Sequence, residues 1–295
     1  MSCSLITNFH THSTWCDGKN SVEELIVGAI ERGFAAIGFT SHAMFPYFES
    51  WSLGPQAAKD YVSCVRAAAE KYSKYIKVYC GLETDYLPGV TTPEQSRYAE
   101  YGLDYIIGSL HWVLAGYSPQ PGMRNPFRSE PLIGADGLLS PAFVSVDHTP
   151  QILADGLRDH FGGSAKALIT AYHEQLREMV TRYDFDILGH PDLYRKYNQK
   201  HPFFDESEQW YRDELVKSAD AIAVSGKLVE VNTGAIGRGW RDDAYPSDEF
   251  RALLRERGVK FVLNSDSHSV DSLDAGFGKY ASAEDYVDFR NHIRR

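Results

Sequence analysis

Short apolar segments alternate with longer amphipathic segments along the whole chain, an order that few folds accommodate. The short segments are rich in β-branched and aromatic residues and predict buried strands, whereas the longer segments predict helices. Repeated strand–helix units pack as a parallel sheet with helices outside it. Seven strands are predicted, at Leu5–Phe9, Ala36–Thr40, Ile76–Leu82, Tyr105–Ser109, Phe185–Gly189, Leu228–Val231 and Lys260–Asn264.

Capping signals mark the starts of several predicted helices. Ser21 and Glu24 have the spacing of a capping box, in which each side chain accepts a hydrogen bond from the other residue's backbone N–H. The segment Asp205–Glu208 offers the same arrangement before a helix predicted at Trp210–Ala223. Ser247 is placed to cap the helix that follows it. These signals support the strand–helix order.

One domain is predicted for all 295 residues, because an α/β barrel commonly takes about 250 residues. Hydrophobic residues make up 43% of the chain, which is enough for a full core. A long irregular loop is expected at about 112–149, where Gly, Pro and Ser are frequent. A loop of this length in a compact domain usually serves as a lid or a binding loop.

The charge balance restricts the partners. The formal net charge is -10, from 40 acidic and 30 basic residues, and no run of Lys and Arg is present. We therefore expect no nucleic-acid partner, although bound dications could still attract a small anion into a pocket. No apolar run is long enough to span a bilayer, so no membrane partner and a cytoplasmic location are expected. The four cysteines lack C-x-x-C spacing and predict reduced thiols, with Cys16 packed near the candidate ligands rather than binding metal.

Candidate metal ligands follow the predicted strands. Six of the seven strands are followed within two residues by His, Asp or Glu, and the carboxyl ends of parallel barrel strands meet at one mouth. The spacing of His10 and His12 places both imidazoles on one face of an extended segment, and Asp266 and His268 repeat it. The candidate ligands are His10, His12, Asp17, His42, Glu83, His111, His190, Asp266 and His268. Together they predict a cluster of divalent metal ions.

The remaining five histidines are not predicted to bind metal. His160, His173, His201 and His292 lie in helical or polar stretches and are expected to be solvated. His148, at the end of the long loop, is a candidate to face a substrate.

The chain resembles the polymerase-and-histidinol-phosphatase (PHP) superfamily, and within it the PHP-type histidinol-phosphatases. The resemblance covers nearly the whole chain. It is carried by His10–Ser13, Cys16–Lys19, Ile37–Ala43, Gly81–Tyr86, Asp104–His111, Phe161–Gly163, Phe185–Leu193, Glu230–Gly234, Tyr245–Ser247 and Asn264–His268. It implies an α/β fold, a distorted (β/α)7 TIM-like barrel in a single domain.

The resemblance also implies a trinuclear site. His10, His12, Glu83 and Asp266 would hold one metal, and Glu83 would bridge to a second. The second would be bound by His111 and His190, and the third by Asp17, His42 and His268. Imidazole and carboxylate ligands suit Zn, Mn or Fe, and the sequence does not choose among them. The substrate implied is L-histidinol phosphate, a small phosphate monoester of histidine biosynthesis, hydrolysed to L-histidinol and phosphate.

The expected mechanism assigns roles around that site. Metals bridged by Glu83 would lower the pKa of a bound water, which would attack phosphorus in line. Asp17, His42 and His268 are expected, by analogy, to help protonate the leaving alkoxide. Phosphoryl transfer also needs cations near the phosphate. Arg195, Lys196, Arg238 and His148 are the candidate substrate- and phosphate-binding residues, and the alternative for the three cations is a solvated surface charge.

Two departures from the family pattern and three other functions remain open. The stretch Val113–Leu139 looks longer than the family's, and Leu110 stands where valine is more usual. The same centre could serve a nucleotide, a nucleic-acid end or a phosphotyrosine peptide, or a binder of phosphorylated ligands that does no chemistry. An amidohydrolase-type deaminase also begins with H-x-H, but it would offer a bridging lysine where this chain has Glu83.

Overall fold

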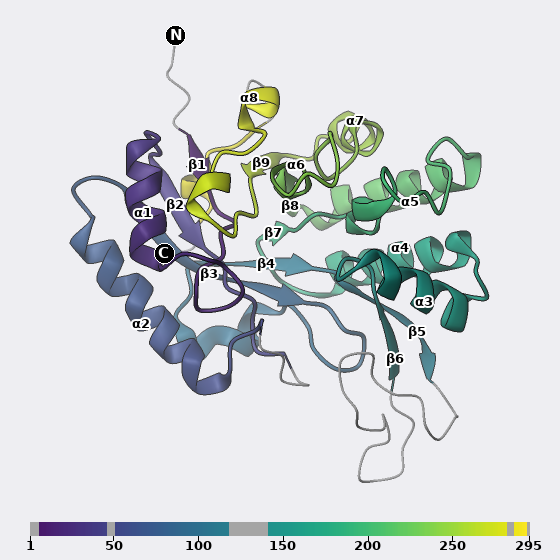
Figure 1. Ribbon diagram of the computed structural model, residues 1–295, viewed down its shortest axis with the longest axis horizontal. Helices are drawn as coiled ribbons and strands as arrows, with labels where there is room; N and C mark the ends of the chain where they lie inside the picture. The colour runs from purple at the N-terminus through teal and green to yellow at the C-terminus, as the bar shows by residue number, and fades with distance from the viewer. Residues whose placement is uncertain (1–5, 46–50, 118–140, 282–285, 294–295) are drawn as a thin grey trace.

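A computed structural model describes residues 6–45, 51–117, 141–281 and 286–293. Seven strands form one parallel sheet in the order β1-β2-β3-β4-β7-β8-β9. Their bounds are β1 Thr7–Asn8, β2 Ala36–Phe39, β3 Lys77–Asp85, β4 Tyr105–Ser109, β7 Ile187–Leu188, β8 Leu228–Asn232 and β9 Phe261–Asn264. All seven predicted strands are therefore present, and the predicted α/β class is confirmed (Figure 1).

The first and last strands meet, so that the sheet curls into a nearly closed barrel. Beyond the strand ends, Thr11 and Ser267 form a parallel bridge. Further back, side chains replace the backbone ladder: the Phe9 N–H donates to Asn264 Oδ1 at 2.8 Å, and Asn8 Nδ2 donates to Ser265 Oγ at 2.6 Å. The barrel is thus joined along a seam at and just beyond the carboxyl ends of the two strands.

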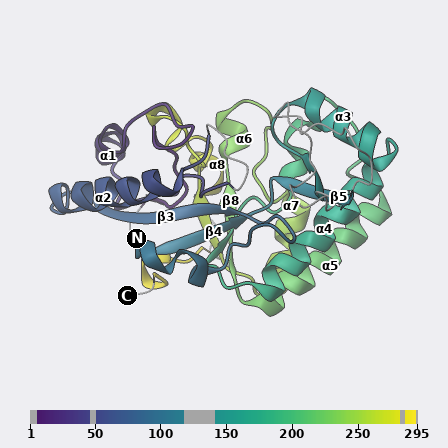
Figure 2. The ribbon, with the colours of Figure 1, turned by 90° about the horizontal axis from the view of Figure 1, so that it is seen from below.

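Helices cover the outside of the barrel. Figures 1 and 2 show α1 and α2 at one side of the sheet and α4 and α5 at the opposite side. The longer helices are α1 Val22–Glu31, α2 Pro55–Lys71, α3 Pro150–Phe161, α4 Ala165–Arg182, α5 Gln209–Ser225 and α7 Asp248–Glu256. In the part of the chain that the structure describes, no helix has the length and apolarity needed to cross a membrane.

Two of the three predicted helix caps are confirmed. Ser21 and Glu24 form a complete capping box at α1, and Ser247 accepts from the Phe250 N–H at the start of α7. The third is wrong, because α5 begins after Glu208 with no side-chain cap. Asp205 instead accepts from the backbone N–H of Ser207 at 2.9 Å, which closes a turn before the helix.

The stretch predicted as an irregular loop begins and ends in strands, which corrects that prediction. β5 Trp112–Tyr117 and β6 Pro141–Ser145 pair antiparallel outside the barrel, beside α3 and α4 (Figure 1). The amide of Gln175 on α4 bonds both the N–H and the carbonyl of Leu114, which fixes the hairpin to the helix. Most of Val113–Leu139, residues 118–139, lies outside the described residues.

The apolar core has two parts. The larger part lies between the sheet and the helices. The smaller part fills the lower barrel with side chains from four strands, from Phe9 just after β1, and from the short helix η4 Phe289–Asn291. Its buried members are Phe9, Ala36, Tyr105, Ile107, Ile187, Val262 and Phe289. This apolar floor leaves the carboxyl ends of the strands as the place where polar side chains gather.

Candidate metal centre

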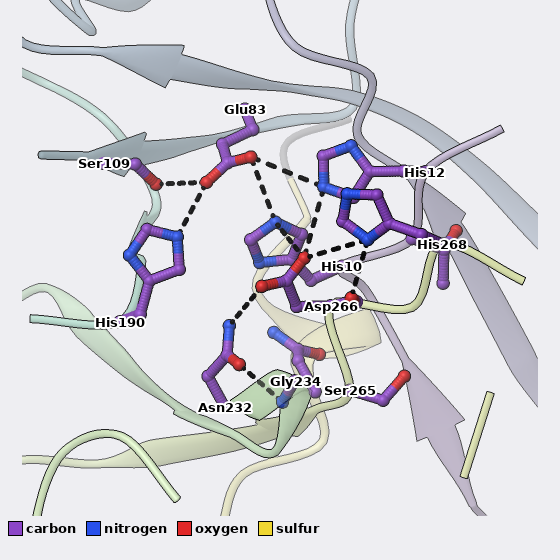
Figure 3. A network of polar contacts seen from close by, with 12 residues as sticks. His10, His12, Glu83, Ser109, His190, Asn232, Gly234, Ser265, Asp266 and His268 are labelled. Atoms are coloured by element: carbon purple, nitrogen blue, oxygen red, sulfur yellow. Dashed lines mark hydrogen bonds and ion pairs between the residues drawn. The ribbon is translucent and has the colours of Figure 1, made fainter. Parts of the chain in front are cut away.

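All nine predicted ligands meet at the carboxyl ends of the barrel strands (Figure 3 shows part of the cluster). They fall into four overlapping groups whose ligand atoms lie within 4.8 Å of one another. The groups are His12, Asp17, His42 and His268; His10, His12 and Glu83; His10, His190 and Asp266; and Glu83, His111 and His190. Residues that are up to 258 positions apart therefore share one small volume, as the strand-end pattern predicts.

Glu83 stands between two of these groups and uses a different oxygen for each (Figure 3). Its Oε2 faces His10 Nε2 at 3.3 Å and His12 Nε2 at 3.4 Å. Its Oε1 faces His190 Nε2 at 2.9 Å and His111 Nε2 at 3.4 Å. A carboxylate that divides its oxygens in this way is placed to bridge two cations.

The spacing of these atoms fits shared cations better than hydrogen bonds. Two ligands about 2.1 Å from one tetrahedral cation lie about 3.4 Å apart. The Glu83 contacts to His10 and His12, at 3.3 and 3.4 Å, and the contact of His12 Nε2 to Asp266 Oδ1, at 3.5 Å, all lie near that separation. All three are longer than an ordinary N–H···O bond.

Asp17 brings His42 and His268 into a third group at the rim of the barrel. Its Oδ1 lies 3.7 Å from His42 Nε2, and its Oδ2 lies 3.2 Å from His268 Nε2. His12 reaches this group with its other nitrogen, since Nδ1 lies 3.6 Å from Asp17 Oδ1 and 3.4 Å from the Cys16 sulfur. Cys16 therefore touches a candidate ligand, and burial raises the pKa of its thiol to about 12.

Unpaired buried nitrogens show that the cluster suits metal ions. Within the described residues, His10 Nε2, His12 Nε2 and His42 Nδ1 are buried and have no hydrogen-bond partner. Such groups carry a desolvation cost that a bound cation would remove. The opposite nitrogens of two ligands are held in place: His10 Nδ1 lies 2.9 Å from Glu230 and His111 Nδ1 lies 2.7 Å from Asp85.

Glu230 is a site residue that the strand-end pattern missed. It lies inside β8, the strand that lacks a ligand at its end, and it is fully buried. Besides His10, its carboxylate accepts from the His190 N–H at 2.8 Å and from the Asn232 and Asn264 amides at 2.7 and 3.0 Å. An acidic residue in the middle of an apolar strand is the signal that could have identified it.

Charge and burial put several ligands in their metal-binding form. Burial alone would raise the pKa of Glu83 and Asp266, but neighbouring cationic side chains hold both pKa values well below the usual range. Burial, with help from two adjacent imidazoles, lowers the pKa of His12 well below 6.5. At His10 and His111 burial also lowers the pKa, but nearby carboxylates outweigh it and raise the net value. A cation would therefore compete with a proton at these two rings.

The backbone at Asp266 is held in an uncommon conformation. Its φ is 48°, in the left-handed region, where aspartate is among the few residues commonly found. Arg238 holds it there, with NH1 donating to the Asp266 carbonyl at 3.1 Å and NH2 to Oδ2 at 2.7 Å. The candidate ligand is thus fixed through both its backbone and its side chain.

A cavity of about 650 Å³ opens above the cluster. Only some of the predicted phosphate-binding side chains line it. Lys196, Arg238 and His148 line it. Arg195 does not, which corrects its prediction as a phosphate-binding residue. Its side chain is 2% exposed, and each of its three nitrogens pairs with a carboxylate, of Asp192, Glu206 or Asp243, at 2.7–3.2 Å.

One of the four histidines predicted to be solvated is buried. His173 is 0% exposed on α4 and lies 2.9 Å from Ser218 Oγ and 2.8 Å from Tyr194 Oη. Burial lowers its pKa to about 3, so the ring is neutral. The prediction is wrong for this residue because α5 and the segment after β7 cover it. His201 and His292 are exposed and His160 is half-buried.

The fold and the cluster together define an α/β barrel protein with a candidate centre for several divalent cations. The sequence pattern of the PHP domain matches residues 8–234, and the chain belongs to this family. It is 26% identical, over 297 residues, to a Schizosaccharomyces pombe protein named "Probable histidinol-phosphatase", with 95% of this chain and 85% of the relative covered.

Two solved structures share the fold. The hisK protein of Listeria monocytogenes superposes with a TM-score of 0.77 at 21% identity and covers 93% of this chain and 100% of its own. The histidinol phosphate phosphatase of Lactococcus lactis, solved as a complex with zinc, L-histidinol and phosphate, superposes with a TM-score of 0.62 at 18% identity. That match covers 95% of each chain.

Proposed function

We propose that this protein hydrolyses L-histidinol phosphate to L-histidinol and phosphate. The observation that carries the proposal is Glu83, whose two oxygens face two different groups of histidines. A bridged centre of this kind suits phosphate monoester hydrolysis. The likeness to proteins named for histidinol phosphate supports the choice of alcohol.

We propose three divalent ions, in the arrangement that the family resemblance implies. His10, His12, Glu83 and Asp266 would hold the first, and Glu83, His111 and His190 the second. Asp17, His42 and His268 would hold the third. Zn, Mn and Fe all suit imidazole and carboxylate donors. When bound, such ions stabilise charge on the transferring phosphoryl group and lower the pKa of a water.

The protein's own side chains would do the remaining work. Lys196 and Arg238 line the cavity and would bind phosphate oxygens, which carry the charge of the transition state. Asp17, His42 and His268 lie at the rim and would bring a proton to the leaving alkoxide. The buried apolar floor keeps bulk water away from the lower side of the centre.

The test is metal analysis and turnover on one purified sample. We expect bound divalent metal and a kcat/KM for L-histidinol phosphate well above that for nucleoside monophosphates and phosphotyrosine. H10A and E83A should abolish turnover and keep the far-UV circular dichroism of the wild type, whereas H201Q, which alters an exposed ring, should stay active. An active E83A protein would contradict the bridging role, and a preference for another ester would contradict the choice of substrate.

A further inference from the structure

The cavity has a second charged feature, a carboxylate on the wall beside the metal cluster. Asp147 lines the cavity after the β5–β6 hairpin, in the segment between β6 and α3. Its side chain is 25% exposed, so it is open to a ligand in the cavity. None of the groups that face the candidate metals includes it.

The backbone at this residue is firmly held. The Asp147 carbonyl accepts from Lys196 Nζ at 2.7 Å and from the Tyr197 hydroxyl. The His148 N–H donates to Ser145 Oγ at 3.3 Å, which closes the turn around Asp147. The carboxylate is therefore pre-positioned, and a ligand would not have to order the segment on binding.

The Asp147 carboxylate itself makes only a long contact with Lys196. Lys196 Nζ lies 3.3 Å from Oδ2, farther than from the carbonyl. Burial raises the pKa of Asp147, but Lys196, His111 and His190 outweigh it and lower the net pKa, so the group is an anion facing the histidine cluster. An anion beside a phosphate site repels a phosphate ester of a neutral alcohol, and it favours one whose alcohol carries a positive charge.

Aromatic side chains flank the same cavity. Trp51, Trp112 and Trp240 all line it. Trp51 packs edge-on against His42 at 5.1 Å between ring centroids, and Trp240 packs edge-on against Tyr197 at 4.8 Å. Indole faces attract planar rings and organic cations. The cavity wall thus presents the Asp147 carboxylate and flat apolar indole surfaces next to the metal cluster, where the phosphate would bind.

We propose that Asp147 binds the cationic part of the substrate's alcohol, with the tryptophans beside its ring, and so selects phosphate esters of small cationic amino alcohols. This inference rests on the proposed function, because the metal cluster must bind the phosphate. Asp147 is then a specificity-determining residue that takes no part in the attack on phosphorus. L-histidinol phosphate fits this arrangement, because its phosphate suits the metal cluster and its ammonium group and imidazole suit Asp147 and the tryptophans.

The test compares two esters in wild type and D147N. For L-histidinol phosphate, kcat/KM should fall about tenfold or more, as expected for loss of a hydrogen bond between charged groups, and mainly through KM. For phenyl phosphate, whose alcohol is neutral, kcat/KM should change less than about threefold or rise. D155N, at an exposed aspartate of α3, is the matched control and should behave as wild type.

Product inhibition gives a readout that needs no phosphate on the ligand. D147N should weaken inhibition by L-histidinol about tenfold or more and leave inhibition by inorganic phosphate within about threefold. If Asp147 only held Lys196 in place, both esters would lose activity equally and L-histidinol inhibition would be unchanged. An equal loss for both esters overturns the inference, and so does unchanged inhibition by L-histidinol.

The two proposals fail in different ways. A wild type that hydrolyses L-histidinol phosphate, with D147N showing no selective loss, keeps the function and rejects the role of Asp147. A wild type that ignores L-histidinol phosphate but hydrolyses phosphoethanolamine in an Asp147-dependent manner rejects the function and keeps the role. A wild type that prefers phenyl phosphate to every cationic ester rejects both.

Discussion

The carboxylate of Glu230 is contacted by four donors, two at each oxygen. Oε2 accepts from His10 Nδ1 and Asn264, and Oε1 accepts from the His190 backbone and Asn232. An amide at this position would turn its NH2 group toward two of these donors. Because the hydrogen-bond partners of ligand imidazoles fix the orientation of these rings, E230Q should weaken metal affinity about 10- to 100-fold.

Competition with a chelating dye measures this loss directly. E214Q is the matched control, since Glu214 is a buried carboxylate of α5 that pairs with Arg177 at 2.8 Å, away from the metal cluster. It should lower stability and leave metal affinity unchanged. Equal metal affinity in E230Q and E214Q would show that Glu230 does not orient the ligands.

His173 should make folding stability depend on pH. Its pKa in the folded protein, about 3, lies below the ordinary value of 6.5. Between these two pH values the ring is protonated in the unfolded chain and neutral in the folded protein. The stabilising contribution of the neutral ring is full above pH 6.5 and falls by about 1.4 kcal/mol per pH unit from there down to about pH 3. Urea unfolding followed from pH 7.5 to 5 should show a free energy of unfolding that declines more steeply below pH 6.5 in wild type than in H173Q. H201Q, at an exposed ring, should keep the wild-type slope, and identical slopes in all three proteins would contradict the prediction.

At this scale the sequence identifies residues whose role depends on strand position and misses those whose role depends on a distant partner. His42 and His190 follow strands, so their convergence could be predicted from local pattern. Arg195 also follows a strand, but three carboxylates from other segments enclose it. His173 looked solvated because the Ser218 and Tyr194 that bury it lie more than 20 residues away.

The short helix η2 Leu193–Tyr197 depends on a buried charge network. Arg195 pairs with Asp192, which is fully buried, and it shares Glu206 and Asp243 with Arg241. R195M would leave the Asp192 carboxylate buried without its cation, which typically costs about 3–5 kcal/mol. Urea unfolding should show a loss of this size. R158M, which removes an exposed ion pair of α3, should change the unfolding free energy by less than about 1 kcal/mol. Equal losses in both variants would contradict the role of the network.

The barrel strands, which alternate with helices along the chain, were easier to predict than the β5–β6 hairpin, which is not part of that alternation. Each barrel strand is a short apolar run before or after a helix, so all seven could be placed, although β1 and β7 are only two residues long. The β5–β6 hairpin joins segments 24 residues apart, from Tyr117 to Pro141, and no short turn marks it. Its inner residues Val113 and Val144 are buried against neighbours that only the fold brings near.

At the scale of the whole molecule, the candidate ligands join six of the seven barrel strands. They follow or lie within β1, β2, β3, β4, β7 and β9, and β8 contributes Glu230 behind them. Cations bound here would therefore tie together strands from both ends of the chain. Because the unfolded chain cannot present this set of ligands, metal binding should add to the stability of the folded protein.

Removing the metal should lower the melting temperature. A cation present at 1,000 times its dissociation constant adds about 4 kcal/mol of stability, and 1 kcal/mol shifts Tm by roughly 2–4 °C in a chain of this size. We expect dialysis against a chelator to lower Tm by roughly 10 °C, and added Zn or Mn to restore it, as followed by scanning calorimetry. E83A, which removes the bridging carboxylate, should start near the chelated wild-type value and respond little to chelation. A wild type whose Tm is the same with and without chelator, although metal analysis shows complete removal, would mean that the barrel is held by the seam and the apolar core alone.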